Sequence, residues 1–391
     1  MKKHIKLLVV LGIILVGSFS FYLFKGYKKD ALVYENNKIK PSSSGIAMML
    51  ETSAGSGNYE MTTRSEWPTE GYVFNANLSK CENGSELSWD NENKKVLMSG
   101  NKSDKCYVYF DVYVKPRFDQ SCNDNTLACH TAKLYTGTQG EKSIYYHDAN
   151  LANGAGDNSY RFAGARDKVN NYLCFGSTQS PCPADNLYRI IGVFDGRVKL
   201  IKSRSVGKKA WDSNNKNTWS TSSLNTYLNN EFITTFDETT KGKIAETTWK
   251  VGGNTWAYIG SVVPYLTYQN EVVNPATTNT TDNATKYSAK IGLMYVSDYG
   301  FAATPSAWTS TLYDYGDKAI KNVNWMYLGS HEWTISRLAD YSNSVLRVYD
   351  TGNVDLDNVD IAYAVRPVFY LSSSVNYASG SGSATDPISI N

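Results

Sequence analysis

Residues 187–203 read LYRIIGVFDGRVKLIKS. This stretch holds two apolar, β-branched runs, Leu187 to Phe194 and Arg197 to Ile201, which are separated by the dipeptide Asp195-Gly196. An Asp-Gly pair between two such runs is typical of a β-hairpin with a type I′ turn, because both turn positions need a positive φ. We therefore predict a buried β-hairpin here.

A segment with helical periodicity follows the hairpin. Residues 217–236 read NTWSTSSLNTYLNNEFITTF, and their apolar side chains recur at intervals of three and four, at Leu224, Tyr227, Leu228, Phe232 and Phe236. This spacing predicts one apolar stripe on a helix that begins near Ser222 or Ser223, with a serine as N-cap. The hairpin and the helix would cover each other's apolar faces and form a core.

The order of several short motifs carries a resemblance to a known family. YRIIGVFDG, KLIKS and WSTSSLNTYLNNEF are followed by KIGLMYVSDYGFA and later by AVRPVFYL. From Tyr160 to Leu371 this order resembles surface proteins of Gram-positive bacteria that carry a domain of unknown function with a C-type-lectin-like pattern. The resemblance implies an α+β domain with a mixed sheet and two helices, in which the first and last strands lie side by side. It implies no catalytic residue.

The N-terminus predicts export across a membrane. After MKKHIK, residues 7–24 form an uncharged apolar run, about the length that spans a bilayer, and the lysines before it favour a cytoplasmic N-terminus. We expect a single-pass membrane protein whose bulk is extracellular. The alternative is a cleaved signal peptide with Ser18 and Ser20 at its cleavage site. Either alternative exports the rest of the chain.

The chain is expected to contain several parts, with an α+β fold class overall. Residues 1–29 would be the cytoplasmic flank and transmembrane helix, 30–55 a stalk, and 56–115 a small β-sandwich, because short alternating runs are separated by turns there. The phrases GYVFNANLSKCENGSELSW and DKCYVYFDVYV also resemble an immunoglobulin-like accessory module of the same surface proteins. Residues 116–158 would be a disulfide-containing connector, 159–375 the C-type-lectin-like domain, and 376–391 a polar tail.

Six cysteines fall into three near-neighbour pairs. In an exported chain this arrangement favours disulfides, although six cysteines allow 15 connectivities. Loop length favours the pairs Cys81–Cys106, Cys122–Cys129 and Cys174–Cys182. Zinc is disfavoured because the four histidines are scattered singly and none has ligand spacing.

Composition excludes a strongly charged nucleic-acid binder. Charged residues make up 19% of the chain, and its net charge of +2 includes six lysines before residue 30. Without them, the chain is slightly acidic, so we expect no nucleic-acid partner.

An acidic loop near the C-terminus is a candidate cation site. Oxygen donors lie at short alternate spacing between the apolar runs VLRVY and AVRPVFYL, and Asp350, Asp355 and Asp357 are the candidate calcium ligands. The EF-hand order of ligands is missing, so a solvated turn is the alternative. Calcium is the one cofactor that the sequence suggests.

The resemblance places ligand binding on the same face. Rigid aromatic side chains with polar neighbours engage sugars or proteins, and the candidates here are Tyr341, Asn343, Arg347, Tyr349, Asn353 and Tyr363. Arg366, within an apolar run, is expected to form a structural ion pair with a core acid, because an unpaired buried charge is too costly.

Catalytic motifs are missing from the sequence. It contains no GxSxG, HExxH or GxxxxGK[ST] motif, and its last cysteine is Cys182, whereas formylglycine-generating enzymes need reactive cysteines late in the chain. We expect a non-enzymatic, membrane-anchored extracellular protein that binds an unknown glycan or protein or mediates adhesion. The alternatives are a structural or appendage subunit of the cell surface, and an enzyme related to the formylglycine-generating fold.

Overall fold

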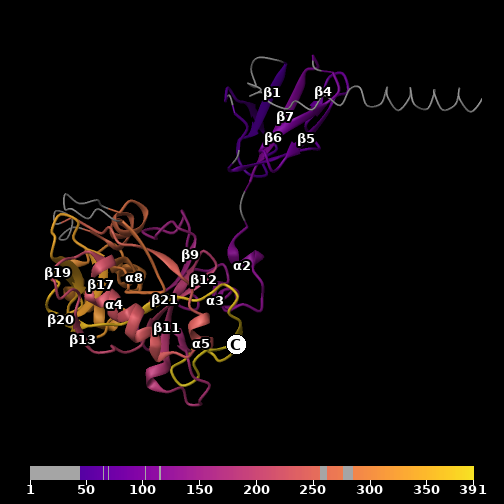
Figure 1. Ribbon diagram of the computed structural model, residues 1–391. Coiled ribbons are helices and arrows are strands. Elements are labelled where there is room, and N and C mark those ends of the chain that lie inside the picture. The colour runs from indigo at the N-terminus through magenta and orange to yellow at the C-terminus, as the bar shows by residue number, and fades with distance from the viewer. Residues whose placement is uncertain are drawn as a thin grey trace, which may run out of the picture. The chain divides into compact units, whose positions relative to one another are not determined.

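The computed structural model describes residues 45–391 apart from 65, 69, 102, 114–115, 256–261 and 276–284, and the side chains of 317–318. The chain divides into two compact units, Met1–Pro116 and Arg117–Asn391 (Figure 1). Each unit has a hydrophobic core of its own.

The first unit is built from short β-strands. Its larger sheet has the order β2-β1-β7-β3, with β4 also paired to β7, and β5 and β6 form a separate hairpin. The strands are β1 (Ile46–Glu51), β2 (Tyr59–Met61), β3 (Tyr72–Phe74), β4 (Lys80–Cys81), β5 (Glu86–Asp90), β6 (Lys95–Ser99) and β7 (Cys106–Val112). β1 lies within the predicted stalk, so the sheet begins before the predicted boundary at residue 56.

The core of this unit follows from alternation along its two central strands. β1 and β7 pair in parallel, and alternate residues of both point to one side, where Met48, Val108 and Phe110 are fully buried. A disulfide joins Cys81 of β4 to Cys106 of β7, and these two residues are direct cross-strand partners.

The second unit contains two larger sheets. The seven-stranded sheet has the order β16-β21-β12-β11-β9-β8, with β10 also paired to β11, and all of its pairs are antiparallel. Its strands are β8 (Ile144–His147), β9 (Ser159–Phe162), β10 (Tyr172–Cys174), β11 (Leu187–Phe194), β12 (Arg197–Lys202), β16 (Ile291–Gly292) and β21 (Val368–Tyr370).

The five-stranded sheet has the order β13-β20-β17-β18-β19, in which only β17 and β20 run parallel. Its strands are β13 (Lys208–Ala210), β17 (Glu332–Arg337), β18 (Ser344–Val348), β19 (Val354–Asn358) and β20 (Ala362–Ala364). Two ribbons complete the unit: β14 (Thr247–Lys250) with β15 (Lys286–Ala289), and β22 (Tyr377–Ser379) with β23 (Ser389–Ile390).

The helices of this unit are short. They are α2 (Phe118–Ser121), α3 (Leu127–Ala132), α4 (Ser223–Thr226), α5 (Glu238–Gly242), α7 (Pro264–Tyr268) and α8 (Val296–Phe301). α3 packs on β11 and β12, whereas α8 packs on β17 and β18 and also reaches Lys199 of β12 through Asp298. α8 therefore connects the two large sheets (Figure 1).

The predicted hairpin is confirmed. β11 and β12 pair antiparallel up to Phe194 and Arg197, and the turn residues Asp195 and Gly196 have φ of 47° and 72°, as a type I′ turn requires. A bulge near Gly192 brings β11 so close to β9 that a Cβ at this position would lie 2.1 Å from a backbone carbonyl oxygen. β9 and β10 both pair with β11.

The predicted helix after the hairpin is present but broken into three pieces. Ser222 caps α4 by accepting a hydrogen bond from Asn225 N at 3.1 Å. A π-helical turn, η3 (Tyr227–Glu231), and a 3₁₀ turn, η4 (Phe232–Thr235), then follow. Four of the five stripe residues are buried, and Tyr227 is half-buried.

Two expectations about the fold are wrong. The α+β class is corrected, because the described chain is mostly β with short helices. One reason for the short helices is that threonine hydroxyls donate to backbone carbonyls of the preceding turn, which competes with extension of the helix. This occurs at Thr226, Thr234 and Thr235. The first and last strands of the predicted lectin-like domain also do not meet. β21 pairs with β12, so the central hairpin separates it from β9 and β10.

The predicted membrane localisation is also corrected. Among the described residues no helix is both long enough and apolar enough to cross a membrane. The predicted transmembrane helix, residues 7–24, lies outside the described residues. The structure therefore gives no support to the single-pass, extracellular arrangement.

The predicted disulfides and the predicted core ion pair are confirmed. Besides the bond in the first unit, Cys122–Cys129 and Cys174–Cys182 are both formed. The Arg366 guanidinium donates to both carboxylate oxygens of Glu332, at 2.6 and 2.8 Å, and both side chains are 1% exposed.

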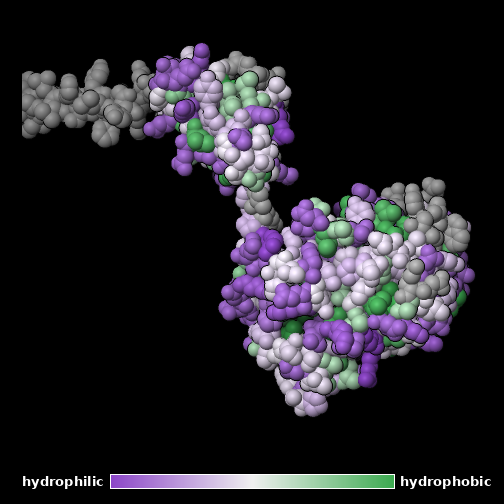
Figure 2. Space-filling view, turned by 180° about the vertical axis from the view of Figure 1, so that it is seen from behind, coloured by the Kyte–Doolittle hydropathy of each residue, from purple (hydrophilic) through white to green (hydrophobic). Residues whose placement is uncertain are grey.

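The face of the second unit that Figure 2 shows is mainly polar, with separate apolar spots.

Candidate functional site

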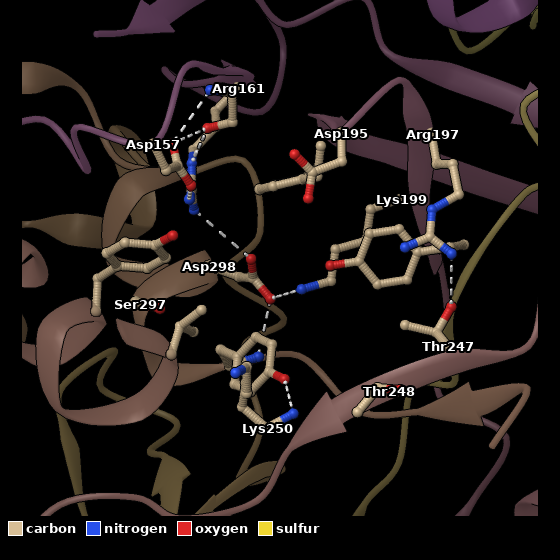
Figure 3. Close-up of a pocket in the computed structure, with 16 residues that line it drawn as sticks. Asp157, Arg161, Asp195, Arg197, Lys199, Thr247, Thr248, Lys250, Ser297 and Asp298 are labelled. Atoms are coloured by element: carbon tan, nitrogen blue, oxygen red, sulfur yellow. Dashed lines mark hydrogen bonds and ion pairs between the residues drawn. The ribbon is translucent and has the colours of Figure 1, made fainter. Parts of the chain in front are cut away.

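A pocket of about 310 Å³ opens beside the turn between β11 and β12 (Figure 3). Its walls come from β9, β12, β14, β21, α7 and α8, which lie far apart in the sequence. The residues that line it are Asp157, Ser159, Arg161, Phe194, Asp195, Arg197, Lys199, Thr247, Thr248, Lys250, Tyr268, Val272, Tyr295, Ser297, Asp298 and Tyr370.

Strand periodicity and helix capping position the charged groups. Arg197 and Lys199 are two residues apart on β12, so their side chains leave the same face of the sheet. Lys199 lies directly opposite Tyr370 of β21. Asp298 lies in the first turn of α8, where its Oδ2 accepts a hydrogen bond from Tyr295 N at 2.9 Å.

A π-helical turn forms another part of the wall. η5 (Gln269–Val273) directly follows α7, and Tyr268 and Val272 reach the pocket from this junction. Glu271 on the same turn is 1% exposed, and its Oε2 accepts from Ser297 N at 3.1 Å. Burial raises the pKa of Glu271 to about 7, although hydrogen bonds from Ser336 and Ser297 act to lower it.

The buried floor of the pocket is a chain of alternating charges. Lys199 Nζ lies 2.5 Å from Asp298 Oδ2, and Arg161 Nη1 lies 3.8 Å from Asp298 Oδ1. Arg161 Nη2 also pairs with Asp157 Oδ2 at 2.6 Å. Figure 3 shows Asp298 between Lys199 and Arg161. The side chains of these three residues are no more than 2% exposed.

The pKa values reflect competition between burial and pairing. Burial lowers the pKa of Lys199, although Asp298 opposes this shift. Burial would raise the pKa of Asp157, but Arg161 and Ser159 lower it to about 2. Burial likewise acts against the charge of Arg161, yet Asp157 raises its pKa above the usual value. The carboxylate of Asp157 is therefore ionised and paired at neutral pH.

Aromatic rings and hydroxyl groups complete the lining. Lys199 Nζ lies 4.5 Å from the ring centroid of Tyr295 and 5.4 Å from that of Phe194, and the Arg161 guanidinium lies 4.7 Å from Phe194. The Ser297 hydroxyl is fully buried and lies next to the Glu271 carboxylate, which accepts a hydrogen bond from the Ser297 side chain.

The arrangement suits binding better than acid–base chemistry. Asp298 is buried and Asp157 is half-buried, and each is held by a cation. Glu271, whose pKa is near neutrality, lies behind Ser297 and is not part of the lining. The pocket thus presents fixed charges, hydroxyls and flat rings to an occupant.

The structure brings together only some of the binding residues predicted from the sequence. The Arg347 guanidinium lies 3.6 Å from the Tyr349 ring centroid and 4.3 Å from that of Tyr363, and it pairs with Asp357 at 2.7 Å. Asn353 lies near this cluster, because its carbonyl accepts from Tyr349 N at 2.8 Å.

Two predicted binding residues lie elsewhere. Tyr341 and Asn343 precede β18, at the end of that strand opposite to Tyr349. The carbonyl of Tyr341 accepts from Asn217 Nδ2 at 2.7 Å, and the side chain of Asn343 accepts from Ser344 at 3.4 Å. The six residues therefore do not form one compact site.

The predicted calcium ligands do not form a metal site. Asp357 is already bound by Arg347 and by the Tyr363 hydroxyl at 2.7 Å, whereas Asp350 lies 3.9 Å from His331 Nε2. Asp355 accepts from the adjacent Leu356 N at 2.7 Å. Across the described parts of the chain, no three or more His, Cys, Asp or Glu side chains are grouped to hold a metal ion.

Comparison with known proteins identifies one domain. Residues 195–373 match the model of a domain of unknown function, DUF6273. This match lies within the second unit. No curated protein and no solved structure matches the chain. The comparisons therefore support the domain of unknown function that the sequence suggested. They give no support for Gram-positive origin, a C-type-lectin-like nature or an immunoglobulin-like module.

The pocket crosses the N-terminal boundary of the DUF6273 match. Arg197, Lys199 and Asp298 lie inside residues 195–373, whereas Asp157 and Arg161 precede them. None of these residues was selected from the sequence. The available signal was a charged residue within an otherwise buried strand, which Lys199 in RVKLIK and Arg161 in SYRF both provide.

Proposed function

We propose that the second unit is a non-enzymatic binding module, and that a small polar ligand occupies the pocket lined by Arg161, Arg197, Lys199 and Asp298. The observation that carries this proposal is the buried Lys199–Asp298–Arg161 network on the wall of a cavity, next to the half-buried Arg197, which has no carboxylate within ion-pair distance among the described residues.

The energetics of buried charges support this proposal. Removing two ions from water costs several kcal/mol per ion, and well-packed apolar residues often stabilise a fold as well or better. Stability alone therefore gives no reason to keep four buried or half-buried charged side chains on one wall. Recognition does, since charges fixed in advance bind polar groups without losing free energy to reorganisation.

The shape and lining support a small ligand with a ring. A volume of about 310 Å³ is at the lower end of ligand pockets in proteins, which run from ~300 to ~1,000 Å³. Phe194, Tyr268, Tyr295 and Tyr370 offer ring faces, and Thr247 and Thr248 offer hydroxyls. Rings combined with hydroxyls and charges suit a hydroxylated molecule such as a sugar better than a hydrocarbon.

The proposal is tested by ligand-observed NMR with panels of monosaccharides, amino acids and small organic acids. Thr248 is exposed at the rim of the pocket, so Thr248→Trp should narrow the entrance without disturbing the core. Thr239→Trp, at an exposed position of α5 that does not line the pocket, is the matched control. We expect binding by the wild type and the control and its loss in Thr248→Trp. Panels without any binder would refute the proposal.

A second candidate surface is the cluster of Arg347, Tyr349 and Tyr363, for a glycan or protein partner. Its support is the stacking of a guanidinium between two half-buried tyrosine rings. If this surface is the binding site, Tyr349→Ala will abolish binding and Thr248→Trp will not. A structural subunit would instead self-associate with increasing concentration, which light scattering measures.

A further inference from the structure

We infer that the ligand of this pocket is a sugar carboxylate: a hydroxylated monoanion of monosaccharide size whose carboxylate is bound by Arg197. This inference rests on the proposed function, because it names the class of ligand for the same pocket. It follows from the charges of the lining and from the position of Arg197.

The lining carries one more positive than negative charge. Four cationic side chains, Arg161, Arg197, Lys199 and Lys250, face three carboxylates. The buried floor is neutral, since Asp157 and Asp298 balance Arg161 and Lys199 in direct pairs. The remaining positive charge therefore belongs to the upper part of the pocket.

Of the two cations in this upper part, Arg197 and Lys250, Arg197 is the one whose planar guanidinium suits a carboxylate. It is half-buried, and no carboxylate of the described residues lies within ion-pair distance of its guanidinium. Among the described residues, the Arg197 guanidinium makes one hydrogen bond, to the Thr247 hydroxyl at 3.4 Å, and it lies 5.2 Å from the ring centroid of Tyr370. Most of its donors are therefore available to a carboxylate, which a guanidinium binds with two parallel hydrogen bonds.

The neighbouring carboxylate does not fill this role. Asp195 is two residues away, at the exposed tip of the turn, and it forms no ion pair with Arg197. Water screens an exposed charge far more than a half-buried one. An anion inside the pocket would thus interact more strongly with Arg197 than Asp195 does.

The rest of the lining fits the rest of a sugar acid. The single excess charge matches a carboxylate better than a phosphate monoester, which carries about −1.5 to −2 at neutral pH. Thr247 and Thr248 can bond hydroxyl groups, and the Tyr370 ring beside Arg197 can cover one face of a pyranose. A ring of that size with one carboxylate is accommodated by about 310 Å³.

The test is isothermal titration calorimetry of the full chain with glucuronate, glucose and glucose 6-phosphate. Glucose is the uncharged match of glucuronate, and the phosphate carries a larger charge. A charge-assisted hydrogen bond corresponds to about tenfold or more in affinity, so glucuronate should bind at least about tenfold more tightly than glucose. Arg197→Gln should remove this preference. Arg204→Gln, at an exposed arginine outside the pocket, should keep it.

Arg197→Lys separates charge from geometry. Lysine retains the positive charge but lacks the planar guanidinium that makes two parallel hydrogen bonds to a carboxylate. This variant should therefore keep only part of the preference for glucuronate. Equal binding of glucose and glucuronate, both lost in Thr248→Trp, would overturn the inference and leave the proposed function standing. Tighter binding of glucose 6-phosphate than of glucuronate would overturn the assignment of a carboxylate. Failure of all three compounds would also overturn it, whereas the proposed function fails only if the wider panels contain no binder.

Discussion

Replacing Glu271 with glutamine should change how the stability of the second unit depends on pH. Glu271 is 1% exposed between η5 and α8, and burial raises its pKa from 4.5 to about 7. Below pH 4.5 the carboxyl is protonated in both the folded and the unfolded state, and its contribution to stability is fully present. As the pH rises towards 7, the unfolded chain releases its proton first, so this contribution is progressively lost.

The expected size follows from the shift itself. A pKa raised from 4.5 to about 7 corresponds to roughly 3 kcal/mol of folding free energy between pH 4 and pH 8. Glutamine is neutral throughout this range and keeps an oxygen that can accept from Ser297 N. Asn254 Nδ2 donates to Glu271 Oε1 at 3.5 Å, and a half-turn of the Asn254 amide would let its Oδ1, which has no partner among the described residues, accept from the glutamine amide. The free energy of unfolding of Glu271→Gln should therefore increase relative to wild type by roughly 3 kcal/mol over this range.

Urea unfolding at several pH values measures this difference. Tryptophan fluorescence reports on the second unit, which contains the five fully buried tryptophans Trp211, Trp249, Trp308, Trp325 and Trp333. Glu238→Gln is the control, since the Glu238 side chain is 90% exposed and pairs only with Lys241. A difference between Glu271→Gln and wild type that stays constant from pH 4 to pH 8 would refute the reasoning.

Three further changes address the fold around the site. Arg366→Met leaves the Glu332 carboxylate buried without its cation and should lower the free energy of unfolding in urea by about 3–5 kcal/mol. Gly192→Ala places a methyl group 2.1 Å from a carbonyl oxygen of β9 and should destabilise the unit by at least ~1–3 kcal/mol, measured by thermal unfolding. Replacing Cys174 and Cys182 together by alanine opens a short loop and should cost about 2–3 kcal/mol in the same assay.

Controls for these changes are available in the same unit. Gly242→Ala, at a helical position where a Cβ meets nothing within 4 Å, should be neutral or slightly stabilising. Equal effects of Gly192→Ala and Gly242→Ala would contradict the close approach of β11 and β9. An unchanged stability of Arg366→Met would show that Glu332 finds another partner or becomes protonated.

Local features of the fold could be predicted from the sequence. The Asp195-Gly196 turn depends on the φ preferences of two adjacent residues, and the Ser222 cap depends on a side chain three residues from its partner. The disulfides followed from short loops. Arg366 was predicted to pair because a lone charge in an apolar strand is costly, although Glu332 could not be named in advance.

Long-range features could not be predicted in the same way. The order of strands in the seven-stranded sheet depends on which edge β21 joins, and this is not encoded in any short motif. The helices are shorter than their apolar periodicity suggested, because threonine hydroxyls bond the preceding turn and π-helical turns change the period.

The pocket combines both difficulties. Its charged residues come from segments near residues 157–161, 195–199, 250 and 298, so their convergence depends on the complete fold. The 341–363 region was predicted because the resemblance to lectin-like surface proteins placed ligand binding there. The structure instead uses Arg347 within that region for pairing with Asp357.

The most direct test of the proposed function is a crystal structure of the protein soaked with the small polar ligands that bind in solution. The account predicts electron density for the ligand inside the pocket, in contact with the Arg197 guanidinium. Ligand density at the cluster of Arg347, Tyr349 and Tyr363, with only water in the pocket, would contradict it.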